Sequence, residues 1–273
     1  MNFYILGYPI SHSVSPSMHN AAFRELGLPH HYSPLAIQPD KLAWIIETKI
    51  KINTFGGANV TIPHKIAIVE YIDELAESAI KAGAVNTLEF NEGVLRGHNT
   101  DATGGVRALK EVYENLSTAN VVLLGAGGAA NALASELVLK VKKITILNRT
   151  LKTARKLSNR LDVEYGSLYD DLAVIESADI LINTTPIGMA PHLAESPVDI
   201  HYLHSDLLVY DIVYNPIKTR LMLDAEKMGA KTLGGLWMLI YQGIESFKIW
   251  TDIEPRAKTM YKAALEALEV MNY

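Results

Sequence analysis

Lys65 and Asp101 are the two ionisable residues of this 273-residue chain whose types and surroundings best suit proton transfer. Lys65 ends the polar segment Asn59-Val60-Thr61-Ile62-Pro63-His64-Lys65, and Asp101 follows Asn99-Thr100. A lysine ammonium is charged at neutral pH, so it can polarise a carbonyl group and protonate the oxygen as the carbon is reduced. Taken singly, each residue has an ordinary explanation, because most lysines are solvated and an aspartate can cap a helix.

Other catalytic groups are missing from the sequence. The chain has no cysteine, which excludes disulfides, zinc–thiolate sites, iron–sulfur clusters and a cysteine nucleophile. Its nine histidines do not form an H-E-x-x-H pair, so we predict no metal site. Lys65 is therefore the remaining candidate with a transferable proton and a positive charge, and we expect it to act as a charged proton donor.

A glycine-rich turn is the second candidate site. Gly125-Ala126-Gly127-Gly128-Ala129-Ala130 follows the apolar residues 121–124 and begins a segment rich in small residues, which fits the G-x-G-x-x-G/A pattern. Glycines let the chain turn tightly and approach a pyrophosphate, whose charge a helix N-terminus stabilises. A strand before the turn and a helix after it favour a dinucleotide site over a simple turn.

The end of the next predicted strand, Asn148-Arg149-Thr150, indicates which dinucleotide binds. An NAD site usually has an acidic residue there for the ribose 2′-hydroxyl. Arg149 stands in its place, with Lys152 and Arg155 close in the sequence. A guanidinium can stack on adenine and pair with a 2′-phosphate, so we predict NADP as the cofactor.

The third candidate site is a hydroxyl-rich segment, residues 7–16, which contains Ser11, Ser13 and Ser15 before Pro16. Hydroxyls and free N–H groups at a helix N-terminus can hold a carboxylate. Simple capping of the helix by Ser15 is an equally good explanation. Thr61 alternates with Asn59 onto one face of a strand predicted at residues 58–62.

Apolar segments alternate with helical patterns along the whole chain, which predicts an α/β fold. The first part has predicted strands at residues 2–6, 32–36 and 58–62 and a hairpin at residues 84–97. After Thr100 the strands are short and continuously apolar, at residues 121–124, 144–147, 180–182 and 207–212, as in parallel sheets covered on both faces. Helical patterns lie between them at residues 129–139, 151–161, 168–176 and 219–228, and a last helix begins at Glu254-Pro255.

These patterns predict two domains. An N-terminal α/β substrate-binding domain comprises residues 1–101 plus 237–273, and a doubly wound Rossmann-type NADP-binding domain comprises residues 102–236, with a cleft between them. The net charge is −5, which argues against a nucleic-acid partner. No apolar segment reaches the ~18–20 residues needed to span a bilayer, and the start of the chain does not resemble a signal peptide. We expect a soluble, cytoplasmic protein without a membrane partner.

Together these segments resemble the shikimate dehydrogenase family. The resemblance runs nearly end to end and is carried by several ordered motifs, at residues 7–16, 59–65, 83–87, 97–101, 125–130, 148–150, 183–189, 211–214 and 234–242. It implies reversible, NADPH-dependent reduction of 3-dehydroshikimate to shikimate in aromatic amino-acid biosynthesis. The chain departs from the family pattern at Ala102 and Thr153.

The resemblance also implies a role for each motif. Lys65 and Asp101 would be the catalytic pair. The substrate would contact Ser13, Ser15, Thr61, Asn86, Tyr214 and Gln242. The cofactor would contact Gly125, Ala126, Gly127, Gly128, Ala129, Asn148, Arg149, Thr150, Thr184, Ile212 and Gly235. A small-molecule substrate and a monomer or homodimer are expected.

Two alternatives remain at this point. A quinate/shikimate dehydrogenase that uses NAD is disfavoured by Arg149. A non-catalytic ligand-binding relative is disfavoured by the presence of both Lys65 and Asp101, which a pure sensor does not need.

Overall fold

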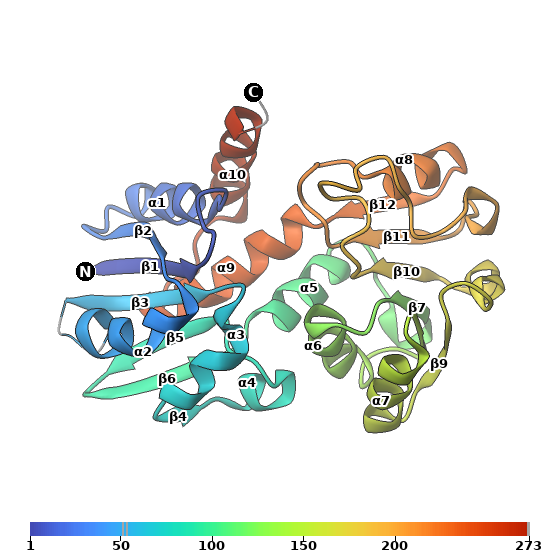
Figure 1. Ribbon diagram of the computed structural model, residues 1–273. Helices are drawn as coiled ribbons and strands as arrows, with labels where there is room; N and C mark the ends of the chain where they lie inside the picture. The colour runs from blue at the N-terminus through green and yellow to red at the C-terminus, as the bar shows by residue number, and fades with distance from the viewer. Residues whose placement is uncertain (51, 53, 272–273) are drawn as a thin grey trace. The chain divides into compact units, whose positions relative to one another are not determined.

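The computed structural model describes residues 1–50, 52 and 54–271, and it divides the chain into two compact units (Figure 1). Unit 1 comprises Met1–Gly104 and Ile240–Tyr273, and unit 2 comprises Gly105–Leu239. Both boundaries fall inside helices, α5 (Asp101–Lys110) and α9 (Leu236–Thr251). Unit 1 is therefore built from both ends of the chain, whereas unit 2 is one continuous segment.

A mixed sheet forms the centre of unit 1. In the described residues its strand order is β2-β1-β3-β5-β6-β4. Strand β1 pairs in parallel with β2 and β3, whereas β5 is antiparallel to both β3 and β6. The bounds are β1 Asn2–Gly7, β2 His31–Ala36, β3 Phe55–Val60, β4 Glu74–Leu75, β5 Thr87–Asn91 and β6 Val94–His98.

The predicted hairpin is present as β5 and β6. Asn91 pairs with Val94, and the two residues between them, Glu92 and Gly93, have φ angles of 50° and 83°. Two successive positive φ angles are the geometry of a type I′ turn, whose twist matches that of the strands. The first strand begins at Thr87, so Asn86 lies just outside it.

The helices of unit 1 cover this sheet. They are α1 (Ser15–Glu25), α2 (Leu42–Ile45), α3 (His64–Ala67), α4 (Glu77–Ala82), most of α9 and α10 (Ala257–Met271), with single turns at Pro39–Lys41, Ile46–Ile50 and Ile68–Tyr71. Met260, Ala264 and Leu268 form the buried stripe of α10, which lies against α1 (Figure 1). Residues spaced by four positions lie on one face of a helix, so these apolar side chains are buried together.

Unit 2 is built on a parallel sheet with the order β12-β11-β10-β7-β8-β9 in the described residues. This is the doubly wound arrangement that the sequence predicts. The strands are β7 Asn120–Leu124, β8 Lys143–Asn148, β9 Glu164–Ser167, β10 Ile180–Asn183, β11 Leu208–Asp211 and β12 Lys231–Gly234. The helices are most of α5, α6 (Gly128–Leu137), α7 (Leu151–Leu161) and α8 (Arg220–Lys227), with turns at Leu116–Thr118, Leu172–Ser177 and Ile200–Tyr202.

Several sequence-based predictions of local structure are wrong in detail. Ser15 is the first residue of α1 rather than its cap, since the N-cap is Val14. The third strand starts at Phe55 and ends at Val60, so Thr61 follows it. The helix predicted at residues 168–176 is only a 3₁₀ segment, Leu172–Ser177, and the last helix starts at Ala257 rather than at Glu254-Pro255.

Three strands, β4, β9 and β12, are not apparent from the sequence. Each is the outermost strand of its sheet, with one side unpaired. An outer strand is covered less completely and needs no continuous apolar run, which is the signal that identifies the central strands. Among the described residues, no helix is long and apolar enough to cross a membrane.

Candidate active site

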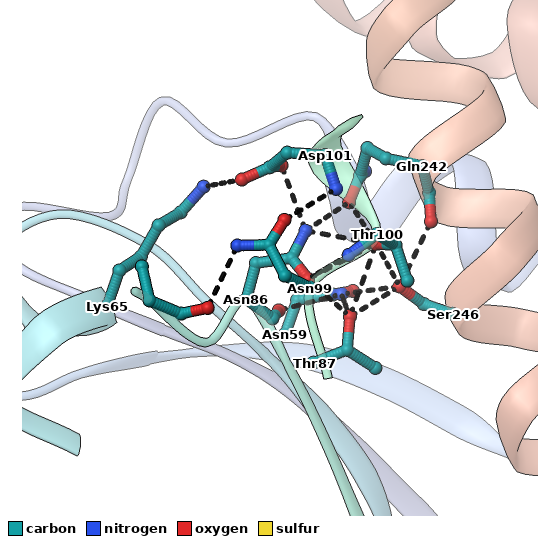
Figure 2. Close-up of polar contacts among 10 residues, drawn as sticks. Asn59, Lys65, Asn86, Thr87, Asn99, Thr100, Asp101, Gln242 and Ser246 are labelled. Carbon is teal, nitrogen blue, oxygen red and sulfur yellow. Dashed lines mark hydrogen bonds and ion pairs between the residues drawn. The ribbon is translucent and has the colours of Figure 1, made fainter. Parts of the chain in front are cut away.

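One edge of the unit 1 sheet gathers polar residues from distant parts of the chain. Strands β1 and β3 run in parallel, and β5 runs against β3, so the ends of β1, β3 and β6 and the start of β5 share an edge. Asn59 pairs with Thr87, and Thr87 pairs with His98. The segments that follow these positions therefore meet, and α9 adds Gln242 and Ser246 to them (Figure 2).

Lys65 and Asp101 are in direct contact at this edge. Lys65 Nζ donates to Asp101 Oδ2 at 2.5 Å, although the two residues are 36 positions apart. Their side chains are 30% and 19% exposed, so the pair is accessible to a ligand. His64 is buried instead, with Nε2 2.7 Å from the Ile37 carbonyl oxygen. Lys65 thus faces the polar edge while its neighbour packs into the core.

Asn86 supports the carboxylate of this pair. Its Nδ2 donates to Asp101 Oδ1 at 2.9 Å, and its Oδ1 accepts the backbone N–H of Thr100 at 2.8 Å (Figure 2). A backbone N–H can only donate, so the orientation of the amide is fixed by its partners. Asn86 is only 2% exposed. Its contact with Asp101 is a feature that sequence reasoning missed.

Gln242, on α9, contacts Asn86 and Thr100. Its Oε1 is 3.4 Å from Asn86 Nδ2 and 3.5 Å from Thr100 Oγ1, which are long hydrogen bonds. A side chain at Gly104 would overlap the backbone nitrogen of Gln242. The missing side chain therefore lets α5 lie directly against α9 and brings Gln242 to the edge.

The other predicted substrate residues of unit 1 lie on neighbouring loops. Thr61 N donates to the Leu6 carbonyl at 2.8 Å, and a Cβ at Gly7 would come within 2.5 Å of Thr61 Cγ2. Ser15 N donates to Ser13 Oγ at 3.3 Å, and the Ser15 side chain is buried. Ser13 rather than Ser15 thus accepts the local backbone hydrogen bond.

The glycine turn of unit 2 joins β7 to α6. Gly125 has φ 106°, a left-handed conformation that favours glycine, and Thr184 Oγ1 lies 2.5 Å from where its Cβ would be. Thr184 Oγ1 donates to the Leu124 carbonyl at 2.6 Å, which ties the loop after β10 to the end of β7. Gly127 is the N-cap of α6, and a Cβ there or at Gly128 would meet no atom of the described residues within 4 Å. Their backbone is thus open to a ligand.

The remaining predicted cofactor residues also follow strands of this sheet. Asn148 ends β8 and donates from Nδ2 to the Thr150 carbonyl at 3.0 Å, and Arg149 between them is exposed. Ile212 N donates to the Asn183 carbonyl at 3.1 Å, and a side chain at Gly235 would overlap the Ile212 carbonyl. In a doubly wound sheet, ligands bind outside the carboxyl ends of the strands. All of these residues are at that edge, together with Ala126 and Ala129.

Asp211 is a buried carboxylate at the same edge. Its Oδ2 accepts from Thr219 Oγ1 at 2.6 Å, and its Oδ1 accepts from Asn183 Nδ2 at 3.0 Å and from Val213 N at 3.1 Å. Burial raises the pKa of Asp211 to about 6. Burial also raises the pKa of Tyr214, a predicted substrate residue three positions after Asp211. Asp211 thus ties the loops after β10 and β11 to the start of α8.

Sequence reasoning also missed Thr87 and Ser246. Both are fully buried, and their hydroxyl oxygens are 2.8 Å apart. Ser246 lies one helical turn after Gln242, which is a signal that the sequence contained. Thr87 follows Asn86 directly.

The strand order and glycine turn of unit 2 define a Rossmann-type, dinucleotide-binding α/β protein, here with a second unit that has an ammonium–carboxylate pair. The chain belongs to the shikimate dehydrogenase family. Residues 5–88 match the model of the shikimate dehydrogenase substrate binding domain, residues 107–212 that of shikimate / quinate 5-dehydrogenase, and residues 235–265 that of the shikimate 5′-dehydrogenase C-terminal domain.

Known proteins are similar over nearly the whole chain. The shikimate dehydrogenase (NADP(+)) of Methanothermobacter thermautotrophicus is 45% identical over 272 residues, which cover 97% of this chain and 95% of that protein. A crystal structure of a shikimate dehydrogenase in complex with NADP+ has a TM-score of 0.91 at 41% identity and covers 98% of this chain and 95% of its own. The structure of shikimate 5-dehydrogenase from Thermus thermophilus in complex with NADP(H) and shikimate has a TM-score of 0.91 at 33% identity. The match covers 98% of this chain and 99% of that one.

Proposed function

We propose that this protein is an NADP-dependent oxidoreductase that reversibly reduces 3-dehydroshikimate to shikimate. The observation that carries the proposal is the direct contact of Lys65 with Asp101 at an accessible polar edge, in a chain whose other unit has the glycine turn of a dinucleotide site. The family supports this assignment, since relatives across nearly the full length are NADP-dependent shikimate dehydrogenases.

The side chains at the edge of unit 1 divide the chemistry between them. Bound NADPH would supply the hydride for the carbonyl carbon. The Lys65 ammonium polarises the carbonyl and donates a proton to the oxygen as it becomes alkoxide-like. Asp101 orients the ammonium through Oδ2 and accepts a hydroxyl of the substrate.

Substrate binding is assigned to the loops around this pair. Ser13 and Ser15 hold the carboxylate of the substrate through hydroxyl and N–H groups at the start of α1, and Tyr214 is assigned to the substrate as well. Thr61, Asn86 and Gln242 bind the ring hydroxyls. These roles assign substrate binding to a domain of residues 1–101 with 237–273 and NADP binding to a domain of residues 102–236.

Cofactor binding is assigned to the carboxyl edge of the unit 2 sheet. The open backbone of Gly127 and Gly128, at the start of α6, receives the pyrophosphate. Arg149 pairs with the 2′-phosphate. A cytoplasmic monomer or homodimer with no nucleic-acid partner fits a small-molecule enzyme of this kind.

The direct test mixes the protein with shikimate and NADP+ and follows the absorbance of NADPH. We expect turnover with the parent protein, and Lys65→Ala should lower kcat by about 10²–10⁴-fold because it removes the proton donor. Absence of turnover with shikimate from neutral to alkaline pH would overturn the proposed function. A large rise in KM with unchanged kcat in Lys65→Ala would assign Lys65 to binding only.

A further inference from the structure

A buried chain of hydrogen bonds leads from the interior of unit 1 to the Lys65–Asp101 pair. It begins at Tyr32, whose hydroxyl donates to Asn59 Oδ1 at 2.8 Å. Asn59 Nδ2 then lies 3.2 Å from the Asn86 carbonyl, which can only accept, so the orientation of this amide is fixed as well. The two hydrogens of Nδ2 are shared among this carbonyl, Ser246 Oγ at 2.9 Å and Thr87 Oγ1 at 3.1 Å.

Thr87 is the link between this interior chain and the site. Its hydroxyl accepts from Asn59 Nδ2 and donates to Asn86 Oδ1 at 2.9 Å, and it also lies 2.8 Å from Ser246 Oγ. Asn86 Oδ1 thus accepts hydrogen bonds from the Thr87 hydroxyl and from the backbone N–H of Thr100. These two bonds direct Asn86 Nδ2 toward Asp101 Oδ1. The direction of donation is the same at every step, from Tyr32 to Asp101 (Figure 2 shows the part from Asn59 onward).

Because these groups are buried, the loss of any one of their hydrogen bonds is costly. Tyr32, Asn59 and Thr87 are at most 5% exposed, so water does not readily replace a partner that one of them loses. In such surroundings hydrogen bonds are strong and polarise one another. Without the Thr87 hydroxyl, Asn86 Oδ1 loses one of its donors, and Asn59 Nδ2 loses an acceptor.

We propose that Thr87 is a positioning residue for the reaction: through Asn86 it holds the Asp101 carboxylate in the orientation that presents Lys65 to the substrate. This inference rests on the proposed function and deepens it. Thr87 itself touches neither the ion pair nor, in the roles assigned above, the substrate.

The test compares Thr87→Val, which replaces the hydroxyl by a methyl group, with Thr87→Ser, which keeps it. We expect Thr87→Val to lower kcat for shikimate formation by about 10- to 100-fold, as small misplacements of catalytic groups do. The primary deuterium isotope effect on kcat with C4-deuterated NADPH should rise, because the chemical step becomes slower than product release. A merely smaller fraction of folded enzyme would leave the isotope effect unchanged. Thr87→Ser should restore both values.

Two further variants keep the test decisive. Tyr32→Phe removes only the first hydroxyl of the chain and should shift kcat and the isotope effect in the same direction, even if Thr87→Val does not fold. Thr145→Val is the matched control, because Thr145 is a buried strand threonine of unit 2 whose hydroxyl bonds Glu164, and it should behave as the parent. Parental kinetics in both Thr87→Val and Tyr32→Phe, or failure of Thr87→Ser to restore activity, would overturn the proposal.

A readout without turnover separates this proposal from the proposed function. In the NMR spectrum of the unliganded protein, the side-chain amide resonances of Asn86 should move in Thr87→Val and return in Thr87→Ser. If they respond while the parent does not oxidise shikimate, the positioning of Asn86 is supported and the proposed function is wrong. If the parent is active and the resonances do not respond, the positioning role is wrong.

Discussion

At the scale of single residues, Arg149 is expected to set the cofactor preference. It is exposed at the end of β8, where an NAD site would have an acid. Arg149→Ala should lower kcat/KM for NADP+ by about 10- to 100-fold, the equivalent of one hydrogen-bonded charge pair, and leave the value for NAD+ nearly unchanged. Steady-state kinetics with both cofactors measure this.

The matched control for Arg149 is Lys143→Ala. Lys143 is a cation at the other end of the same strand, and it pairs with Glu164. Its removal should not change the ratio of the two kcat/KM values. A parent protein that prefers NAD+ would contradict the role given to Arg149.

Asp211 makes the stability of the protein depend on pH. Burial raises its pKa from 3.8 to about 6, so the stabilising contribution is fully present below pH 3.8 and is lost as the pH rises through about 6. The ionised form then costs about 3 kcal/mol at pH 7. In Asp211→Asn, the carbonyl can still accept from Asn183 and Val213, and the amide can donate to Thr219 Oγ1.

The free energy of unfolding of Asp211→Asn should therefore rise relative to that of the parent by about 2 kcal/mol between pH 4 and pH 7, since part of the effect falls below pH 4. Urea unfolding at the two pH values measures the difference. A constant difference across this range would show that the carboxyl of Asp211 does not titrate as its burial predicts.

At the scale of elements, the crossing of α5 and α9 depends on Gly104. A methyl group there would overlap backbone atoms of Gln242, which cannot move aside without moving the helix. Gly104→Ala should destabilise the protein by about 1–3 kcal/mol, as overpacking does, and should raise the KM for shikimate because Gln242 is displaced. Denaturant unfolding and steady-state kinetics measure the two effects.

The neighbouring glycine provides the control. At Gly105 the new methyl group would meet mainly the end of the Leu133 side chain, which can rotate. Gly105→Ala gains the same helix propensity, about 1 kcal/mol, so the comparison isolates the contact with Gln242. Equal KM values for shikimate in the two variants would argue against the role of Gly104.

The elements also show how far the sequence could predict this molecule. The central strands and the glycine turn were predictable, because continuous apolar runs and a G-x-G-x-x-A pattern are local signals. The outer strands β9 and β12 were not, because they contain no continuous apolar run, whereas the outer strand β2 was predicted at residues 32–36. The hairpin was predictable from Asn91-Glu92-Gly93, since a turn of this kind is encoded by the residues that form it.

Some residues of the candidate site were predictable from the sequence and others were not. Lys65 and Asp101 were predictable as a pair only through the resemblance, because their contact depends on the pairing of β3, β5 and β6. The contacts of Thr87 and Ser246 depend on the packing of α9 over that edge, and a hydroxyl in a strand or helix gives no sign of its distant partner. Charged residues in polar motifs are thus easier to find than the buried groups that hold them.

At the scale of the whole molecule, the two units differ in how they depend on the order of the chain. Unit 2 is continuous and has its own buried core, in which Val122, Leu181 and Val209 come from adjacent strands. Unit 1 needs both ends of the chain: the Phe23 ring of α1 packs against Phe247 of α9 at 4.8 Å, and Trp250 Nε1 donates to the Leu88 carbonyl. The rings of Phe247 and Trp250, from residues after 239, are therefore part of one aromatic cluster with Phe3 and Phe23.

We therefore expect the fragment of residues 105–239 to fold by itself and the fragment of residues 1–104 to remain unfolded. The first fragment keeps all six strands of its parallel sheet, the glycine turn and Arg149, so it should unfold cooperatively and bind NADP+ more tightly than NAD+. The second loses α9 and α10 and exposes the apolar faces of α1 and of the sheet, which it cannot bury alone. Circular dichroism with thermal unfolding tests both fragments, and titration calorimetry tests cofactor binding to the first. A cooperative transition in residues 1–104 alone would contradict the dependence of unit 1 on the C-terminal helices, and a folded 105–239 fragment that binds neither cofactor would show that the dinucleotide site also needs residues of unit 1.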